Sequence, residues 1–175
     1  MMKWLLKVLN LLQRTLSVDM KIVKKDTFPS VFFRGISNEN DLDNDVYLKS
    51  SAFLFGTDVP EDRIDNNREL SVVWDDCQEA LETLLKQRKT KGDGFQFPCG
   101  YATITLSKFE DTVLKYITGG IVSYERKPIY GDTESGIEDN PYHGNILLHK
   151  SASDQQKKNI QHTLATIAEF TRRKD

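Results

Sequence analysis

The feature that most constrains the fold is a change in the spacing of apolar residues from Leu70 onward. Leu70, Val72 and Trp74 stand at alternate positions, as on the buried face of a strand. The stretch 80–85 then carries alanine and leucine at helical spacing. Both periods recur further along, so the sequence predicts strands and helices within one chain.

Applied to the whole sequence, these periods predict seven strands and three helices besides an N-terminal one. The predicted strands cover residues 21–25, 30–35, 46–56, 70–76, 95–106, 120–129 and 145–150. The stretch 46–56 is either a strand or a buried apolar segment, and the strand 95–106 is expected to be broken or bulged near Pro98 and Gly100. Capping pairs mark the helix starts: Asp76 with Glu79, Ser107 with Glu110, and Ser153 with Gln156. Gly119 is expected to cap the second helix, and the third is expected to lead into a basic tail, residues 171–174.

The chain of 175 residues fits one domain, and 38% hydrophobic residues supply a core. We expect a single α+β domain over residues 20–175, with a mixed or antiparallel sheet and helices on one face. The predicted core comprises Trp74, Leu81, Leu85, Val113, Ile117, Val122, Ile146, Leu148, Leu164 and Ile167.

Residues 1–19 predict a separate amphipathic helix. Its apolar face includes Trp4, Leu5, Leu9 and Leu12, and lysines lie mostly opposite. Polar interruptions argue against a signal peptide, and the segment is too short to span a bilayer. The helix is expected to bind the domain, a second copy or another protein, with contact to a membrane surface as the less favoured alternative. Met20 is a possible alternative start.

Composition and charge exclude several classes of function. A formal net charge of −2 gives no electrostatic case for nucleic-acid binding. Cys77 and Cys99 are too few for a disulfide scaffold and suit a reducing cytoplasm, although a single bridge between them stays open. His143 and His149 lack the close ligand spacings of zinc sites, so we expect no metal and no cofactor.

The most distinctive stretch is NPYHGN, residues 140–145. Asn140 and Pro141 favour a turn, and Gly144 supplies a permissive backbone angle before the next strand. We expect the Tyr142 ring to be packed while its hydroxyl finds a polar partner. His143 is the best candidate for a base, acid or ligand group, and the carboxylates of 138–139 are expected to favour its imidazolium form.

A weaker pattern lies in FFRGIS, YLKSS and the later acidic loop. This order of arginine, serine and glutamate resembles that of ADP-ribosyltransferases. The resemblance implies that Arg34 and Ser50 or Ser51 would hold a dinucleotide, and that Glu134 or Glu138 would orient its ribose. It is one version of an enzyme hypothesis in which Tyr142, His143, Arg34 and Glu138 are the catalytic candidates.

The ordered blocks SSAF, LSVVW, VSYER and NPYHGNILL, between residues 50 and 148, resemble a group of small bacterial proteins of unassigned activity. That resemblance implies a bacterial, cytoplasmic accessory protein, with links to mobile or phage-defence gene clusters. Because the sequence shows no coherent catalytic set, we expect a non-enzymatic interaction protein. Its expected binding residues are Trp4, Leu5, Leu9, Leu12, Tyr142 and His143, and the small enzyme is the alternative.

Overall fold

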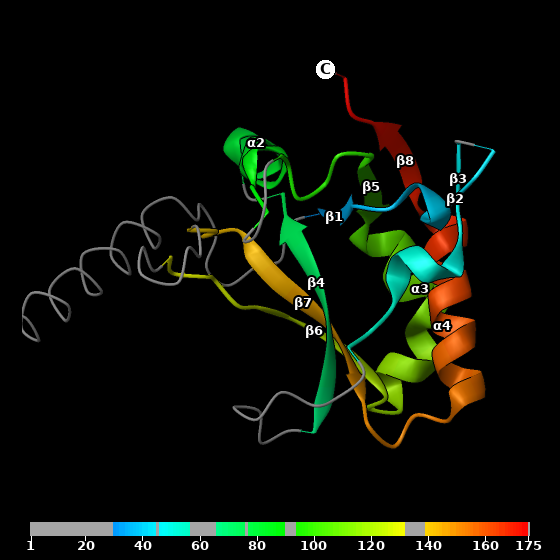
Figure 1. Ribbon diagram of the computed structural model, residues 1–175. Helices are drawn as coiled ribbons and strands as arrows, with labels where there is room; N and C mark the ends of the chain where they lie inside the picture. Colours follow the sequence, from blue (N-terminus) through cyan, green and yellow to red (C-terminus); the bar gives the residue numbers. More distant parts are fainter. Residues whose placement is uncertain are drawn as a thin grey trace, which may run out of the picture.

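The computed structural model describes residues 30–44, 46–56, 66–75, 77–89, 94–131 and 139–174. The predicted N-terminal helix and the strand 21–25 lie outside these residues. Figure 1 shows a curved sheet with two long helices beside it. The strands are β1 (Val31–Ile36), β2 (Leu42–Asp43), β3 (Tyr47–Leu48), β4 (Asn67–Trp74), β5 (Gly100–Thr105), β6 (Val122–Arg126), β7 (His143–His149) and β8 (Glu169–Arg172). The helices are α2 (Gln78–Lys86), α3 (Leu106–Thr118) and α4 (Asp154–Ile167), with 3-10 turns η1 (Glu39–Asp41) and η2 (Ser50–Phe53).

Six strands form one antiparallel sheet in the order β6-β7-β4-β1-β5-β8, and β2 pairs with β3 separately. The predicted α+β class is therefore confirmed, with the antiparallel alternative. Helices α3 and α4 cover one face of the sheet, whereas α2 packs on the other. The prediction that the helices lie on one face is therefore wrong.

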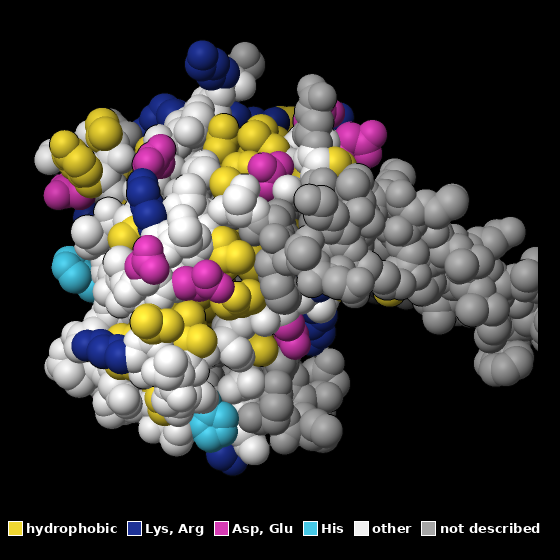
Figure 2. Space-filling model, turned by 180° about the vertical axis from the view of Figure 1, so that it is seen from behind, with side chains coloured by type: hydrophobic (Ala, Val, Ile, Leu, Met, Phe, Trp, Pro, Cys, Tyr) yellow, Lys and Arg dark blue, Asp and Glu magenta, His cyan; other side chains and the backbone are white. Residues whose placement is uncertain are grey.

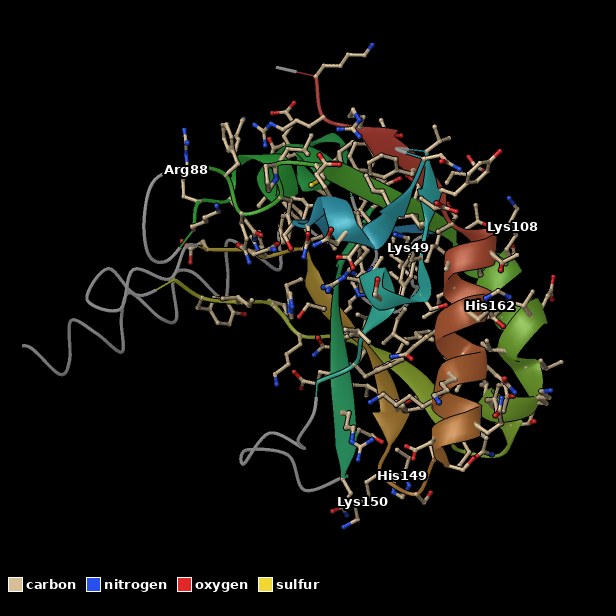
Figure 3. The ribbon with its side chains drawn as sticks, turned by 45° about the vertical axis from the view of Figure 1, so that its right-hand side comes forward. Lys49, Arg88, Lys108, His149, Lys150 and His162 are labelled. Carbon is tan, nitrogen blue, oxygen red and sulfur yellow. The ribbon has the colours of Figure 1, made fainter. Side chains whose placement is uncertain are left out.

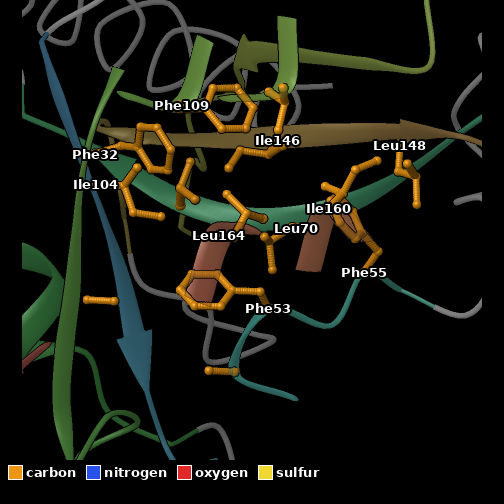
Figure 4. Packing of buried hydrophobic residues seen from close by; sticks show 14 of the residues in the cluster. Phe32, Phe53, Phe55, Leu70, Ile104, Phe109, Ile146, Leu148, Ile160 and Leu164 are labelled. Atoms are coloured by element: carbon orange, nitrogen blue, oxygen red, sulfur yellow. The ribbon is translucent and has the colours of Figure 1, made fainter. Parts of the chain in front are cut away.

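The main core lies between the sheet and the pair α3 and α4 (Figure 4). Phe32 and Ile36 of β1 and Leu70, Val72 and Trp74 of β4 contribute to it, because side chains at alternate positions of a strand point to one face. Phe32 makes edge-to-face contacts with Trp74 and Phe109, at ring-centroid distances of 5.3 and 5.8 Å. Such contacts join α3 to the centre of the sheet.

The second face carries a smaller apolar cluster beneath α2. Phe33 and Val73 from the sheet pack there with Ala80, Leu84 and Tyr142. Because Phe33 follows Phe32 directly, one strand serves both cores through its two faces. Cys77 and Cys99 are both free thiols, which settles the open question of a bridge between them.

Strands β1 and β4 pair only through Phe32↔Trp74 and Phe33↔Val73, whereas β1 and β5 pair along six residues. Beyond Phe33, the side chain of Arg34 donates to the backbone carbonyls of Ser71, at 3.0 Å from Nη1, and Ala52, at 3.4 Å from Nε. The Arg34 guanidinium therefore donates hydrogen bonds at the point where the backbone pairing between β1 and β4 stops.

Several predicted boundaries differ from the structure. The stretch 46–56 is the short β3 followed by η2, with Ala52 and Phe53 buried in the main core, so the alternative of a buried apolar segment fits most of it better than a strand. In the predicted strand 95–106, regular pairing begins at Gly100, where the break was expected. The final helix stops at Ile167, since Ala168 is extended and Glu169–Arg172 forms β8 on the edge of β5.

The capping predictions have mixed outcomes. Ser153 and Gln156 form the predicted reciprocal pair, with Gln156 N donating to Ser153 Oγ at 3.2 Å. Helix α3 begins at Leu106, so Ser107 lies within its first turn and is not the cap. Gly119 is the C-cap of α3, as predicted. Cys77 occupies the N-cap of α2, and Asp76 lies outside the described residues.

Six predicted core residues are fully buried: Trp74, Val113, Val122, Ile146, Leu148 and Leu164. The other four, Leu81, Leu85, Ile117 and Ile167, are partly buried. Ile117 and Ile167 pack against the main core, and Leu81 packs against the cluster beneath α2. None of the ten is exposed, so the core prediction is largely confirmed. No helix in the described ranges is long and apolar enough to cross a bilayer.

Candidate functional site

The stretch NPYHGN is both a turn and the start of a strand. Asn140 exchanges two backbone hydrogen bonds with Ile129, at 2.9 and 3.0 Å, and its Oδ1 accepts from Tyr142 N at 3.2 Å. This asparagine-centred turn was expected. However, β7 already begins at His143, so His143 and Gly144 belong to the sheet rather than to the loop.

Tyr142 behaves as predicted for a packed tyrosine. Its ring is buried in the cluster beneath α2, and its hydroxyl donates to Glu79 Oε2 at 3.1 Å. Burial, followed by Cys77 and Glu79 close by, raises the pKa of the Tyr142 phenol. The Tyr142 hydroxyl therefore links the sheet to α2 through Glu79.

Gly144 is required for a reason different from the one expected. It is not among the described glycines with positive φ. A Cβ at this position would instead overlap the indole of Trp74 and come within 2.5 Å of Glu125 O. The indole crosses β7 over this glycine to donate from Nε1 to Glu125 O at 3.2 Å. Close approach of a side chain, not backbone conformation, selects glycine here.

His143 is buried, with 9% of its surface exposed, and its Nδ1 lies 2.7 Å from the carbonyl oxygen of Lys127. A carbonyl only accepts, so Nδ1 carries the proton and Nε2 presents its lone pair. Burial lowers the pKa of His143 despite the opposing influence of Glu69 and Glu125. The expected imidazolium is therefore wrong: the folded protein favours the neutral ring.

Two carboxylates, Glu138 and Asp139, were expected beside His143, and the structure describes Asp139 alone of the two. Asp139 Oδ1 accepts from Gly131 N at 2.6 Å, and Glu138 lies outside the described residues. The acidic groups that influence His143 are instead Glu69 and Glu125, on the neighbouring strands. Glu69 forms an ion pair with Lys127 at 2.9 Å, so much of its charge is compensated locally.

His143 borders a pocket of about 220 Å³ that opens where β1 and β4 part. The pocket mixes aromatic, aliphatic, amide and cationic groups. Its lining is Phe33, Arg34, Gly35, Ser71, Val72, Val73, Leu84, Gln87, Arg88, Gln96, Phe97, Ile129, Asn140 and His143. Among the described residues of this lining there is no aspartate or glutamate. We call it the β1–β4 pocket.

The structure brings two of the sequence candidates, Arg34 and His143, to this pocket. Tyr142 directly precedes His143 in sequence but is not part of the lining. Ser51 is exposed on η2, and Ser50 lines a different hollow between the β2–β3 hairpin and α4. Because Glu134 and Glu138 lie outside the described residues, the ADP-ribosyltransferase-like set is not assembled in the part that is described.

The pocket also contains residues that no sequence pattern singled out. Gln87 and Arg88 follow the end of α2, and Gln96 and Phe97 come from the segment that returns to the sheet. Gln96 N donates to Gln87 O at 2.9 Å, which holds these segments together. From sequence, residues 87–94 were only a basic helix end. The one sequence signal for this segment is the alternation of Phe95 and Phe97, two aromatic residues just after a turn-rich stretch.

The hollow between the β2–β3 hairpin and α4 is a second surface feature. Val46 and Tyr47 are 60% and 69% exposed there, and Figure 2 shows hydrophobic side chains at this edge of the molecule. Ala165 and Ala168 form part of its floor, and His162 stands on the α4 side. None of the described residues that line it is buried, whereas the β1–β4 pocket includes the buried His143. The β1–β4 pocket is therefore the stronger candidate.

Within the described ranges, no three His, Cys, Asp or Glu side chains are grouped to hold a metal ion. In comparisons with known proteins, no protein-family model, curated protein or solved structure matches this chain.

Proposed function

We propose that this protein is a non-enzymatic interaction module that receives a segment of a partner protein in the β1–β4 pocket. The observation that carries the proposal is the lining itself: apolar walls from Phe33, Phe97 and Leu84, with polar groups that include the His143 acceptor. Its volume is below the roughly 300–1,000 Å³ typical of sites for drug-sized ligands. A single side chain or chain end matches the pocket better than a cofactor.

The arrangement supports binding more than catalysis. A catalytic histidine is usually oriented by a carboxylate and placed beside a nucleophile. Here Nδ1 is held by a backbone carbonyl, and Ser71 is the sole hydroxyl-bearing residue among those that the structure describes in the lining. No hydrogen bond joins Ser71 to His143 in the described structure. The protein would then act as a cytoplasmic accessory subunit of a bacterial, defence-type assembly.

Site-specific photo-crosslinking tests the proposal. A photoreactive amino acid replaces Gln96, which is exposed and lines the pocket, or Lys158, which is exposed on α4 as a matched control. The full-length protein is irradiated in its native cells. We expect one partner segment to be captured from position 96 and not from position 158, with capture reduced by His143→Ala. Equal capture from both positions would contradict a specific site.

A small enzyme remains the second candidate because one observation favours it. A neutral imidazole with Nε2 free to accept is the form that a general base requires. The captured segment separates the two functions. Incubated with the wild-type protein and with His143→Ala, an enzyme substrate changes mass only with the wild type, whereas a binding partner keeps its mass with both.

The N-terminal segment, residues 1–17, supplies a second proposed contact. Its apolar face, which includes Trp4, Leu9 and Leu12, suggests binding to another protein or to a second copy. Deletion of residues 1–17 should leave the circular-dichroism spectrum of the folded domain intact. Sedimentation should show weaker self-association or loss of the partner. Unfolding of the shortened chain would show that this segment belongs to the core instead.

A further inference from the structure

The β2–β3 hairpin places apolar side chains in solvent beside the hollow that it forms with α4. Val46 and Tyr47 have the two largest exposed fractions among the exposed large hydrophobic residues that the structure describes. Both line the hollow, whose volume is about 630 Å³. Grouped apolar exposure of this kind marks interaction sites, whereas single exposed apolar residues do not. We call the hollow and these two residues the hairpin surface.

The pairing within the hairpin decides which side chains point outward. Leu42 pairs with Leu48, and Asp43 pairs with Tyr47. Leu42 is buried in the main core, and Leu48 packs against it. Because side chains alternate along a strand, the other pair, Asp43 and Tyr47, is exposed. The hairpin is thus fixed to the fold through its inner pair while it presents Tyr47 to a partner.

The rim of the hollow carries charges of both signs. Asp43 supplies a carboxylate, and Lys49, which directly follows β3, supplies an ammonium group. Both side chains are exposed, and Lys49 Nζ donates to the carbonyl oxygen of Asn40 at 3.2 Å. Figure 3 shows Lys49 near β3 and His162 on α4, the elements on the two sides of the hollow. A surface with both signs is complementary to a copy of itself.

This combination suits a second copy of the chain better than other occupants. In an interface with twofold symmetry, a protruding group and the hollow that receives it lie on the same surface of each copy. Tyr47 and the hollow meet this condition, and so do Asp43 and Lys49, since each can face the opposite charge of the other copy. A small ligand fits less well, because none of the described lining residues is buried.

We propose that the hairpin surface is a contact between two copies of this chain. Tyr47 of each copy enters the hollow of the other, and Asp43 of each copy faces Lys49 of the other. Ala165 and Ala168 line the hollow on the α4 side, and their small side chains leave room for a ring. The inference goes beyond the proposed function, since the β1–β4 pocket takes no part in the contact.

The size of the contact predicts a weak dimer. One aromatic side chain buries roughly 150–250 Å², whereas stable interfaces bury roughly 1,200–2,000 Å² in total. The two Tyr47 rings therefore supply only part of the required area, and Val46 and the α4 side of the hollow add to it. We expect the dimer to form as the protein concentration rises.

Sedimentation velocity of the full-length protein over a series of concentrations tests the proposal. The average sedimentation coefficient should rise from the value of a monomer toward that of a dimer. Tyr47→Ser should weaken dimerisation about tenfold or more, because a central tyrosine often supplies much of the binding energy of an interface. Leu114→Ser is the matched control and should have no effect, since Leu114 is 55% exposed on α3 and does not line the hollow.

Charge reversal identifies the paired residues. Asp43→Lys places two positive charges at each contact, and Lys49→Asp places two negative charges there, so each variant alone should dimerise several-fold more weakly. Mixed in equal amounts, the two variants should associate again, because every contact then joins opposite charges. A contact within one copy would give no such recovery. High salt should reduce the recovery, since exposed charges are screened.

Several results would overturn the inference. They are a monomer at all concentrations, which would leave the surface to a different protein, an unchanged dimer with Tyr47→Ser, an equal loss with Leu114→Ser, and no recovery in the mixture. Loss of the dimer with Leu9→Ser but not with Tyr47→Ser would also overturn it, in favour of the N-terminal segment. Circular dichroism checks that each variant is folded. If Tyr47→Ser does not fold, the charge-reversal mixture decides.

Discussion

The two faces of the central sheet differ in what they bury. The face toward α3 and α4 is almost wholly apolar, and its aromatic rings and aliphatic side chains form one continuous cluster. The opposite face has only five buried residues in its cluster beneath α2, and it also carries His143, Glu69 and Asn145. Because free energy of burial follows apolar area, the first face supplies most of the stability. The second face can therefore carry a polar pocket without loss of the fold.

The largest expected effect comes from Gly144, which lies on the apolar side. Gly144→Val should lower the free energy of unfolding by roughly 3 kcal/mol or more, because the added atoms overlap the Trp74 indole and break its bond to Glu125 O. Urea unfolding measures the loss. Gly119→Ala is the control: φ is ordinary there, and the added Cβ would lie 3.2 Å from Lys115 O. An equal loss at both glycines would show that overlap with the Trp74 indole is not the cause of the destabilisation.

The next effect compares one leucine from each face. Leu164→Ala, in the main core, should cost about 2–5 kcal/mol, since it leaves a cavity in a fully enclosed site. Leu81→Ala, partly buried beside the α2 cluster, should cost about 1 kcal/mol. Thermal and urea unfolding of the two variants test the ranking. A reversed order would mean that the cluster beneath α2 contributes more to stability than the main core does.

Tyr142→Phe should have a smaller effect, about 1 kcal/mol, because it removes one hydroxyl while the ring stays packed. It also leaves Glu79 without this donor, so the loss should diminish in Tyr142→Phe with Glu79→Gln. A double-mutant cycle measures the coupling. Additive losses in the cycle would show that the bond to Glu79 does not hold α2 in place.

The smallest effect concerns His143 and depends on pH. Its folded pKa is below the ordinary value of 6.5, so the unfolded chain binds more protons as the pH falls below that value. Stability from this group is thus complete above pH 6.5 and declines as the pH falls toward the folded pKa. His143→Gln should flatten that part of the curve between about pH 5 and 7, measured by urea midpoints. The facing charges Glu69, Glu125 and Lys127 remain in the variant.

The sequence predicted elements well where the apolar period was long. The strand around Leu70–Trp74, the helix from Ser153 and most of the core residues are in this class. The sequence failed at β8, since no residue between Ile167 and Glu169 breaks a helix. The extended conformation there follows from pairing with β5. Tertiary pairing outweighed local propensity.

The candidate site was only half predictable. His143 stood out by its residue type, and Arg34 was noted for another reason. The neutral state of His143 and the contribution of Gln87 and Gln96 could not be predicted from sequence. Both depend on which strands are neighbours in the sheet. The strand order places β7 beside β4 and β4 beside β1. That order brings residues 33, 73 and 143 together. The spacing of apolar residues along one chain predicts strands but not their order in the sheet.

The same strand order determines how the molecule is assembled in time. β1 lies between β4 and β5, so both its edges are completed by segments that are about 40 and 70 residues distant along the chain. Contacts between such distant segments require large loops to close first, which slows the search for the native state. A refolding chain therefore passes through a period in which Phe32 and Phe33 have no permanent neighbours. Chaperone dependence and sensitivity to protein concentration during refolding are the practical signs of that delay.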